Sequence, residues 1–238
     1  LGKGDFAAGA GIDAAGNGKV SLNRGDVLEV IAKHDGPSGQ YGADISGTRL
    51  KANQPVQVIA GHSCANIPTA TTDACDHIEH SMLPIETLGK EYHVTFPAAL
   101  ASQSPHVVRI VAIEPNTKLS FDPPSVSADK TLSPSDPPLE LSAVTSDFKV
   151  SSDKAFMVAQ YMQGQGSVPS GSGDPSLALS VPAAQYRKSY TFIASASYDT
   201  NFVNVIAKTG STVTLDGTAI PAASFTAIGS SGFSVARV

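Results

Sequence analysis

Apolar and polar residues alternate along most of the chain, in short runs separated by glycine, proline, asparagine and serine. The clearest runs are rich in β-branched and aromatic residues and cover residues 27–31, 56–59, 92–96, 107–111, 156–158, 190–193 and 203–206. Side chains of a strand point alternately to its two faces, so this period of two predicts strands with one buried face. Short strands with turn residues between them are typical of a β-sandwich or barrel. We therefore expect an all-β fold.

One segment departs from this alternation. Residues 73–82 contain neither glycine nor proline, Asp73 is a suitable N-cap, and Pro84 follows shortly afterwards. Helices commonly begin at an aspartate N-cap and stop before a proline. We therefore expect one short helix, of about two turns, near residues 73–82.

Blocks of similar sequence recur in the same order along the chain. The matching blocks are residues 22–30 and 132–141, 50–58 and 150–158, 83–92 and 181–190, and 108–112 and 203–207. Roughly 100 residues is the usual size of one sandwich domain. The pattern predicts two tandem β-sandwiches related by an internal repeat, at residues 19–125 and 126–238, joined near the proline-rich stretch 122–138. Residues 1–18, which are rich in glycine, would be the tail of a preceding copy, and the alternating run 233–238 suggests that the natural chain continues.

Composition narrows the function classes. Only 16% of the residues are charged, 41% are hydrophobic, and 16 Lys and Arg against 21 Asp and Glu give a net charge of −5. The sequence has no basic block, so the chain is not expected to bind nucleic acid. No apolar run approaches the roughly 20 residues of a membrane-spanning helix. The sequence has neither a Walker loop nor a glycine-rich dinucleotide motif, and we expect no cofactor.

The two cysteines of the chain are Cys64 and Cys75. Their even number, their close spacing and the charge-poor composition favour a disulfide over two free thiols, as in proteins of oxidising compartments. The same region contains His62, His77 and His80. Thiolates and imidazoles at such separations can form a tetrahedral zinc site, so these three histidines are candidate metal ligands if the cysteines are not bonded to each other.

A possible nucleophile lies in the same region. Ser63 is the central residue of Gly61-His62-Ser63-Cys64-Ala65, which matches half of the G-x-S-x-G nucleophile elbow. That motif requires a helix to begin at the serine. Ala65 replaces the second glycine, and Pro68 prevents a helix from following, so the sequence does not favour a serine hydrolase.

An RGD tripeptide, Arg24-Gly25-Asp26, lies between two expected strands. It could display a receptor-binding loop, or it could form a turn in which Gly25 supplies a positive φ. The corresponding residues of the second unit, Pro134-Ser135-Asp136, keep the composition of a turn and lose the arginine. The turn is therefore the favoured interpretation.

A longer pattern extends from residue 56 to residue 97. It consists of residues 56–65, Ala74-Cys75-Asp76-His77, Leu83-Pro84 and Gly89-Lys90-x-Tyr92, with residues 22–27 and 108–112 in keeping with it. This pattern resembles the N-terminal domain family of the IgG Fc-binding protein, which includes many bacterial secreted and surface proteins. The resemblance implies a secreted, non-catalytic β domain in which Cys64 and Cys75 are paired. One difference is Leu88, where the family pattern has tryptophan before the glycine.

The sequence thus predicts an extracellular or cell-surface module for adhesion or interaction that is not an enzyme and binds a protein or a glycan. One alternative is a structural subunit of an extracellular fibre, in which a terminal segment of one copy completes the sheet of the next by strand addition. A less favoured alternative is a metal-dependent enzyme that uses His62, His77 and His80.

Overall fold

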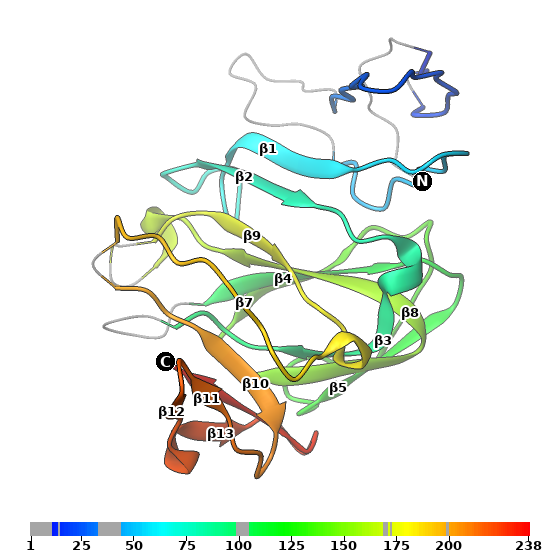
Figure 1. The fold of residues 1–238 in the computed structure, drawn as a ribbon. Helices are drawn as coiled ribbons and strands as arrows, with labels where there is room; N and C mark the ends of the chain where they lie inside the picture. The colour runs from blue at the N-terminus through cyan, green and yellow to red at the C-terminus, as the bar shows by residue number, and fades with distance from the viewer. Residues whose placement is uncertain are drawn as a thin grey trace.

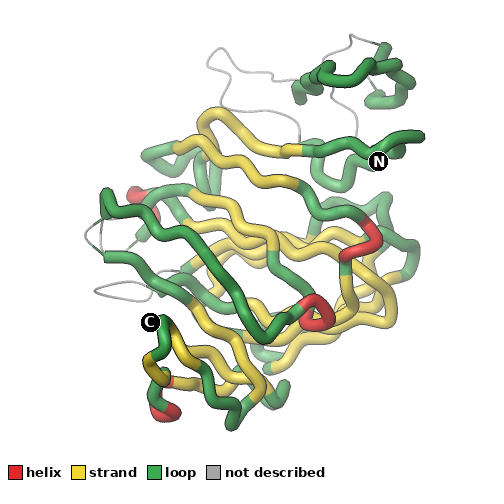
Figure 2. Tube along the Cα trace, in the orientation of Figure 1, coloured by secondary structure: helices red, strands yellow, loops and turns green. Residues whose placement is uncertain are grey.

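The computed structural model describes residues 11–13, 15–32, 44–98, 105–168, 171, 173–198 and 200–238. These residues form strands connected by loops and by short 3-10 turns (Figures 1 and 2). The strands are β1 (Ile59–Ala65), β2 (Asp76–Ser81), β3 (Gly89–Val94), β4 (His106–Ala112), β5 (Thr117–Asp122), β6 (Lys130–Leu132), β7 (Leu139–Val144), β8 (Phe148–Met162), β9 (Ser176–Leu179), β10 (Asn204–Lys208), β11 (Thr214–Leu215), β12 (Thr218–Ala219), β13 (Phe225–Ala227) and β14 (Phe233–Arg237). The 3-10 turns are η1 (Ile85–Thr87), η2 (Gln165–Ser167), η3 (Ala183–Gln185) and η4 (Ala222–Ser224). The all-β prediction is confirmed.

The helix predicted over residues 73–82 is wrong, because this segment contains strand β2. Ile78 is buried and its neighbours His77 and Glu79 are exposed, which is the alternation of a strand. Ala74 has a φ of +64°, outside the helical region. A helix this short gains little from local hydrogen bonds, and antiparallel pairing with β1 outweighs its propensity.

Strand β8 organises the main sheet, which has seven strands. The first part of β8 pairs with β3 over residues 148–151 on one edge and with β5 over residues 149–152 on the other. The second part pairs with β4 over residues 156–162 and with β9 over residues 159–162. β6 adds to β5, and β7 adds to β4. One long strand is thus shared by two groups of strands, which pack face to face in a sandwich-like arrangement.

The hydrophobic core lies between these two groups of strands. Its buried residues are Tyr92, Val94, Val108, Ile110, Leu119, Phe121, Val144, Phe148, Val150, Phe156 and Val158. The Tyr92 and Phe156 rings lie 4.8 Å apart between their centroids. The Tyr92 hydroxyl donates a hydrogen bond of 2.6 Å to the Phe156 carbonyl, so the polar end of this buried ring has a partner.

The boundary predicted between residues 125 and 126 falls within this sheet, between β5 and β6. These two strands pair with each other, and both β4 and β5 pair with β8 from the other predicted unit. Strands from both predicted units therefore contribute to one sheet, because the pairing partners of β4 and β5 come later in the chain. The structure does not confirm two complete sandwiches in tandem.

A smaller sheet of three strands, in the order β10-β14-β13, packs beside the main sheet. Arg237 of β14 forms an ion pair with Asp147, and its guanidinium lies 3.5 Å from the centroid of the Phe96 ring. The Asn204 side chain of β10 donates hydrogen bonds to Thr95 and to the Phe96 carbonyl. These contacts attach the C-terminal strands to the end of β3.

Among the described residues, no helix has the length and apolar character needed to cross a membrane.

Candidate functional site

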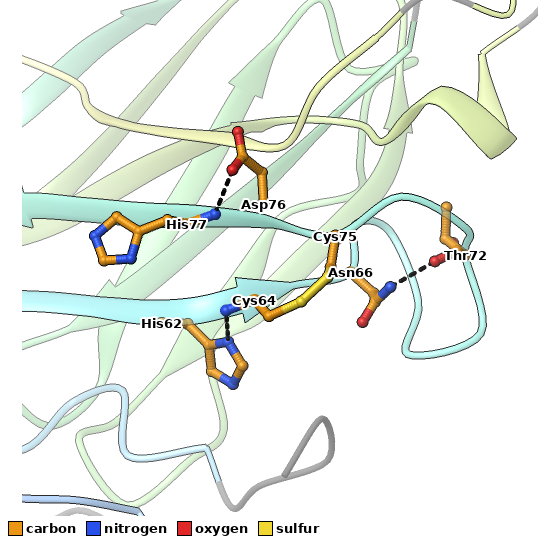
Figure 3. The surroundings of a disulfide bond; sticks show 7 residues. All are labelled: His62, Cys64, Asn66, Thr72, Cys75, Asp76 and His77. Atoms are coloured by element: carbon orange, nitrogen blue, oxygen red, sulfur yellow. Dashed lines mark hydrogen bonds between the residues drawn. A yellow bond between two sulfur atoms is a disulfide. The ribbon is translucent and has the colours of Figure 1, made fainter. Parts of the chain in front are cut away.

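The region in which the sequence places most candidate residues is the hairpin of β1 and β2. The strands pair antiparallel from Ile59 opposite Ser81 to Ala65 opposite Asp76, with a register shift between His62 and Ala65. At this shift Cys64 and Cys75 form a disulfide, with a Cα–Cα distance of 5.0 Å (Figure 3). The disulfide predicted from the cysteine spacing is therefore present, and it closes the loop between the strands.

The closed loop is held by hydrogen bonds at both ends. The Asn66 side chain donates to the Thr72 carbonyl at 2.6 Å (Figure 3), and the Thr72 backbone N–H donates to the Thr69 carbonyl at 2.9 Å. The Gly164 N–H donates to the Ile67 carbonyl, which attaches the loop to the segment after β8. A Cβ at Gly164 would lie 2.7 Å from the Ala74 carbonyl oxygen, so this close approach needs glycine. Asn66 and residues 70–75 of this loop line a hollow of about 410 Å³.

Replacing both cysteines with serine is expected to lower the free energy of unfolding by roughly 2–3 kcal/mol, because the unfolded chain regains the freedom of the loop. Urea denaturation of the oxidised wild type and of the double variant, each fitted with its own slope, measures this change, because the unfolded variant is less compact. A difference below about 0.5 kcal/mol would contradict a stabilising disulfide. Ser63→Ala, an exposed change in the same strand, is the control and is expected to have little effect.

The three candidate histidines do not converge. His62 lies opposite Ile78, so it shares a face of the hairpin with Ile78 and His80, and His77 lies on the other face. The His62 ring accepts a hydrogen bond from the Cys64 N–H at 3.0 Å, and His77 lies 3.4 Å from the Glu79 carboxylate. No group of three His, Cys, Asp or Glu side chains placed to hold a metal ion occurs among the described residues. The period of a strand places His77 and His80 on opposite faces, whereas a helix would have placed them on one face.

Ser63 is not placed as a nucleophile. It is exposed in the middle of β1, and the chain continues as a strand rather than turning into a helix. The strand–turn–helix geometry of a nucleophile elbow is therefore not formed at this serine.

The RGD residues form a turn. The Asp26 N–H donates to the Asn23 carbonyl at 3.1 Å, the Asp26 carboxylate accepts from the Asn23 N–H at 2.7 Å, and Gly25 has a φ of +90°. The same two hydrogen bonds close the turn at Ser133 and Asp136, at 2.9 and 2.7 Å. Arg24 is exposed on this turn, so its guanidinium can contact a partner. Receptor binding by this tripeptide stays a prediction.

An arginine on β4 lies in a charged cluster that the sequence alone does not reveal. Arg109 donates to Glu140 at 2.7 Å and to Asp44 at 2.9 Å, and its guanidinium lies 5.9 Å from the centroid of the Tyr161 ring. Burial acts to raise the pKa of Asp44, but the hydrogen bonds from Ser46 and the charge of Arg109 lower it overall. Arg109 and Glu140 face each other across β4 and β7, so only the strand pairing could have identified the pair.

Buried polar rings form a second group that the sequence does not reveal. His93 is buried, packs 4.2 Å from Phe233 between ring centroids, and its Nδ1 lies 3.3 Å from the Tyr186 hydroxyl. Burial lowers the pKa of His93 and raises that of Tyr186 to about 12. Both rings therefore stay neutral near neutral pH, and their role is to join β3, η3 and β14.

The fold and the hairpin define the chain as a sandwich-like β protein with one disulfide-closed loop. A family model described as "IgGFc binding protein" matches residues 2–238, so the chain belongs to this family. The resemblance inferred from the sequence is thereby confirmed. A curated relative, the IgGFc-binding protein of Homo sapiens, is 32% identical over 136 residues, which cover 55% of this chain and 2% of that protein. The chain thus spans a small part of the relative's length, and no solved structure matches it.

Proposed function

We propose that this chain is an extracellular, non-catalytic module that binds a protein. The observation that carries the proposal is the family match over residues 2–238, together with a relative whose printed name is IgGFc-binding protein. The disulfide of the β1–β2 hairpin supports an oxidising, extracellular location, since cytosolic thiols are kept reduced. The Fc region of an antibody is therefore the first protein ligand to test.

The disulfide-closed loop between Cys64 and Cys75 is the part of the surface that we expect to contact the partner. It projects from one end of the hairpin, its threonines 69 and 71 are exposed, and its backbone is fixed by the hydrogen bonds to Ile67 and Thr72. A loop that is already ordered loses little conformational entropy on binding. The RGD turn offers a second contact through the exposed Arg24.

Binding of the purified chain to immobilised Fc, measured by biolayer interferometry, tests the proposal. We expect a saturable signal that falls roughly tenfold or more in affinity for a Thr69→Glu/Thr71→Glu double variant, because two buried carboxylates would be unpaired. Arg24→Ala tests the RGD turn and keeps the Asp26 hydrogen bonds; Glu86→Ala, on η1, is the surface control. No binding to Fc or to any serum protein, whether or not a glycan array is bound, would contradict the proposal.

A second candidate function is that of a structural subunit that assembles by strand addition. It is favoured by the edge of β10 that pairs with no strand of the described chain, and by the exposed apolar residues Leu50, Val56 and Ile59 leading into β1. Negative-stain microscopy of the concentrated protein, beside a variant without residues 1–18, tests it. Filaments that depend on concentration would support assembly, and monodisperse particles from both proteins would exclude it.

A further inference from the structure

The β1–β2 hairpin has the same pairing register as the end of the main sheet. The ladder of β1 and β2 joins Ile59 to Ser81, Ala60 to His80, Gly61 to Glu79 and His62 to Ile78. The ladder of β8 and β9 joins Ala159 to Leu179, Gln160 to Ala178, Tyr161 to Leu177 and Met162 to Ser176. Every residue of the second ladder lies 100 positions after its counterpart on β1, or 98 positions after its counterpart on β2. The hairpin therefore corresponds to the last part of β8 together with β9.

The C-terminal sheet corresponds in the same way to another part of the main sheet. β4 pairs with β7 through Arg109 opposite Glu140 and Ile110 opposite Leu139. β10 pairs with β14 through Asn204 opposite Arg237 and Val205 opposite Ala236, at offsets of 95 and 97. Both pairs of strands are antiparallel. β10 therefore corresponds to β4, and β14 corresponds to β7.

The correspondence fails at one edge. β4 has β8 on its second edge, whereas the described chain pairs no strand with the second edge of β10. The backbone N–H groups of Val203 and Thr209 donate to the carbonyls of Val238 and Gly232, on the side of β14. Because the direction alternates along a strand, the N–H and C=O of Ile206 point to the other edge. No hydrogen bond to either group is found among the described residues.

The segment that corresponds to residues 150–158 of β8 has one backbone hydrogen bond among those found in the described chain, from the Met82 N–H to the Val58 carbonyl at 2.8 Å. Residues 50–58 match residues 150–158 in sequence, yet they form no strand in the structure. Leu50 is 58% exposed and Val56 is 53% exposed, whereas their counterparts Val150 and Phe156 are fully buried. Tyr190, the counterpart of the buried Tyr92, is also 67% exposed. Residues 50–58 thus form a segment with exposed apolar residues and no partner strand, and β10 has an edge without a partner strand in the described chain.

We infer that residues 56–59 of one copy of this chain add as an antiparallel strand to the free edge of β10 in a second copy. The register is that of β8 on β4, where Ile110 faces Val158 and Ala112 faces Phe156. It places Val58 opposite Val205 and Val56 opposite Ala207. The contact rests on the second candidate function above and identifies its interface.

The occupant is a second copy because the two surfaces lie apart in one chain. β1 and the segment before it lie on one side of the seven-stranded sheet, and β10 lies on the opposite side (Figure 1). Since the two contact surfaces differ, the contact is heterologous, and repeated contacts extend head to tail. The exposed Val56 and Ile59 of one surface and the partly exposed Val205 and Ile206 of the other supply the hydrophobic contribution to association.

Disulfide trapping tests the register directly. A Val58→Cys protein is mixed with a Val205→Cys protein in a glutathione buffer, and mixed dimers are identified by non-reducing electrophoresis and mass spectrometry. Val203→Cys is the matched control on the same face of β10, one pair further along. Directly opposite Cβ atoms come within about 5 Å and diagonal ones only within about 7 Å, so we expect roughly tenfold more dimer with Val205→Cys than with Val203→Cys.

A backbone variant gives an independent test. Ile206→Pro removes the N–H that points to the free edge but none of the N–H groups that bond to β14. We expect sedimentation velocity to report concentration-dependent association of the wild type and roughly tenfold weaker association of this variant. Circular dichroism and the intact Cys64–Cys75 disulfide verify that the variant is folded.

The outcomes separate this interface from assembly in general. Monomers at all concentrations, with no trapped dimer, would overturn both the interface at β10 and self-assembly in general. Association that Ile206→Pro leaves unchanged, with equal trapping at positions 203 and 205, would overturn the interface alone. Fc binding is measured on a different surface and does not depend on either result.

Discussion

Replacing Phe156 with alanine is expected to lower the free energy of unfolding by about 3–5 kcal/mol, the usual range for a large buried aromatic ring. Phe156 is fully buried at the point where β8 passes between the two groups of strands. It faces Ala112 on one side and Gly89 on the other, and its ring packs on Tyr92. Alanine would leave a cavity between the two groups, which relaxation of a long, doubly paired strand can fill only in part.

Urea denaturation followed by circular dichroism measures the effect of this change. The midpoint should fall and the slope should stay constant, since the same surface is exposed on unfolding. Met162→Ala is the matched control on the same strand, because Met162 is 39% exposed at its end. We expect the control to change stability by less than about 1 kcal/mol. A Phe156→Ala protein that is as stable as the control would mean that the two groups of strands do not share this core.

Acidification from pH 7 to pH 4 is expected to destabilise the protein by roughly 3 kcal/mol through His106 alone. The His106 side chain is fully buried, and burial lowers its pKa to about 4. Its Nδ1 lies 3.1 Å from the Val144 carbonyl, a contact that favours the protonated ring, while the charge of Arg237 disfavours it. Its Nε2 has no partner among the described residues, so a proton there would be buried without an acceptor.

The sign follows from the two protonation equilibria. In the unfolded chain a histidine takes up its proton as the pH falls through about 6.5, whereas folded His106 stays neutral until about pH 4. Between these values the unfolded state binds more protons, so the free energy of unfolding decreases as the pH falls. Burial lowers the pKa of His93 as well, and this contributes in the same direction.

Stability curves of wild type and His106→Gln, measured from pH 7 to pH 4, isolate this contribution. Glutamine can donate to the Val144 carbonyl but carries no titrating proton, so the variant should show a flatter profile over this window. His77→Gln, at a side chain that is 60% exposed, is the control and should keep the wild-type profile. Equal slopes for wild type and His106→Gln would refute the assignment to His106.

Local features of this protein followed directly from the sequence. The runs of β-branched and aromatic residues at 92–96 and 107–111 predicted strands β3 and β4, because such runs favour extended backbone. The Cys64–Cys75 disulfide and the turn at Arg24-Gly25-Asp26 were also predictable, since each depends on residues close together in the chain. The strand β2 was missed because residues 73–82 combine helix signals with only two full alternations, and pairing with β1 decided between them.

Features that depend on residues far apart in the chain were decided only by the tertiary structure. The sequence does not specify which strands pair, so the position of β8 between β3, β4, β5 and β9 could not be inferred, and the predicted boundary near residue 125 cut through the sheet. Burial of His93 and His106, and the meeting of Arg109 with Asp44 and Glu140, depend on the same pairings. The sequence determined which segments favour extended backbone and turns, because these preferences are local. The tertiary structure determined their partners, because pairing and burial are energies shared between distant segments.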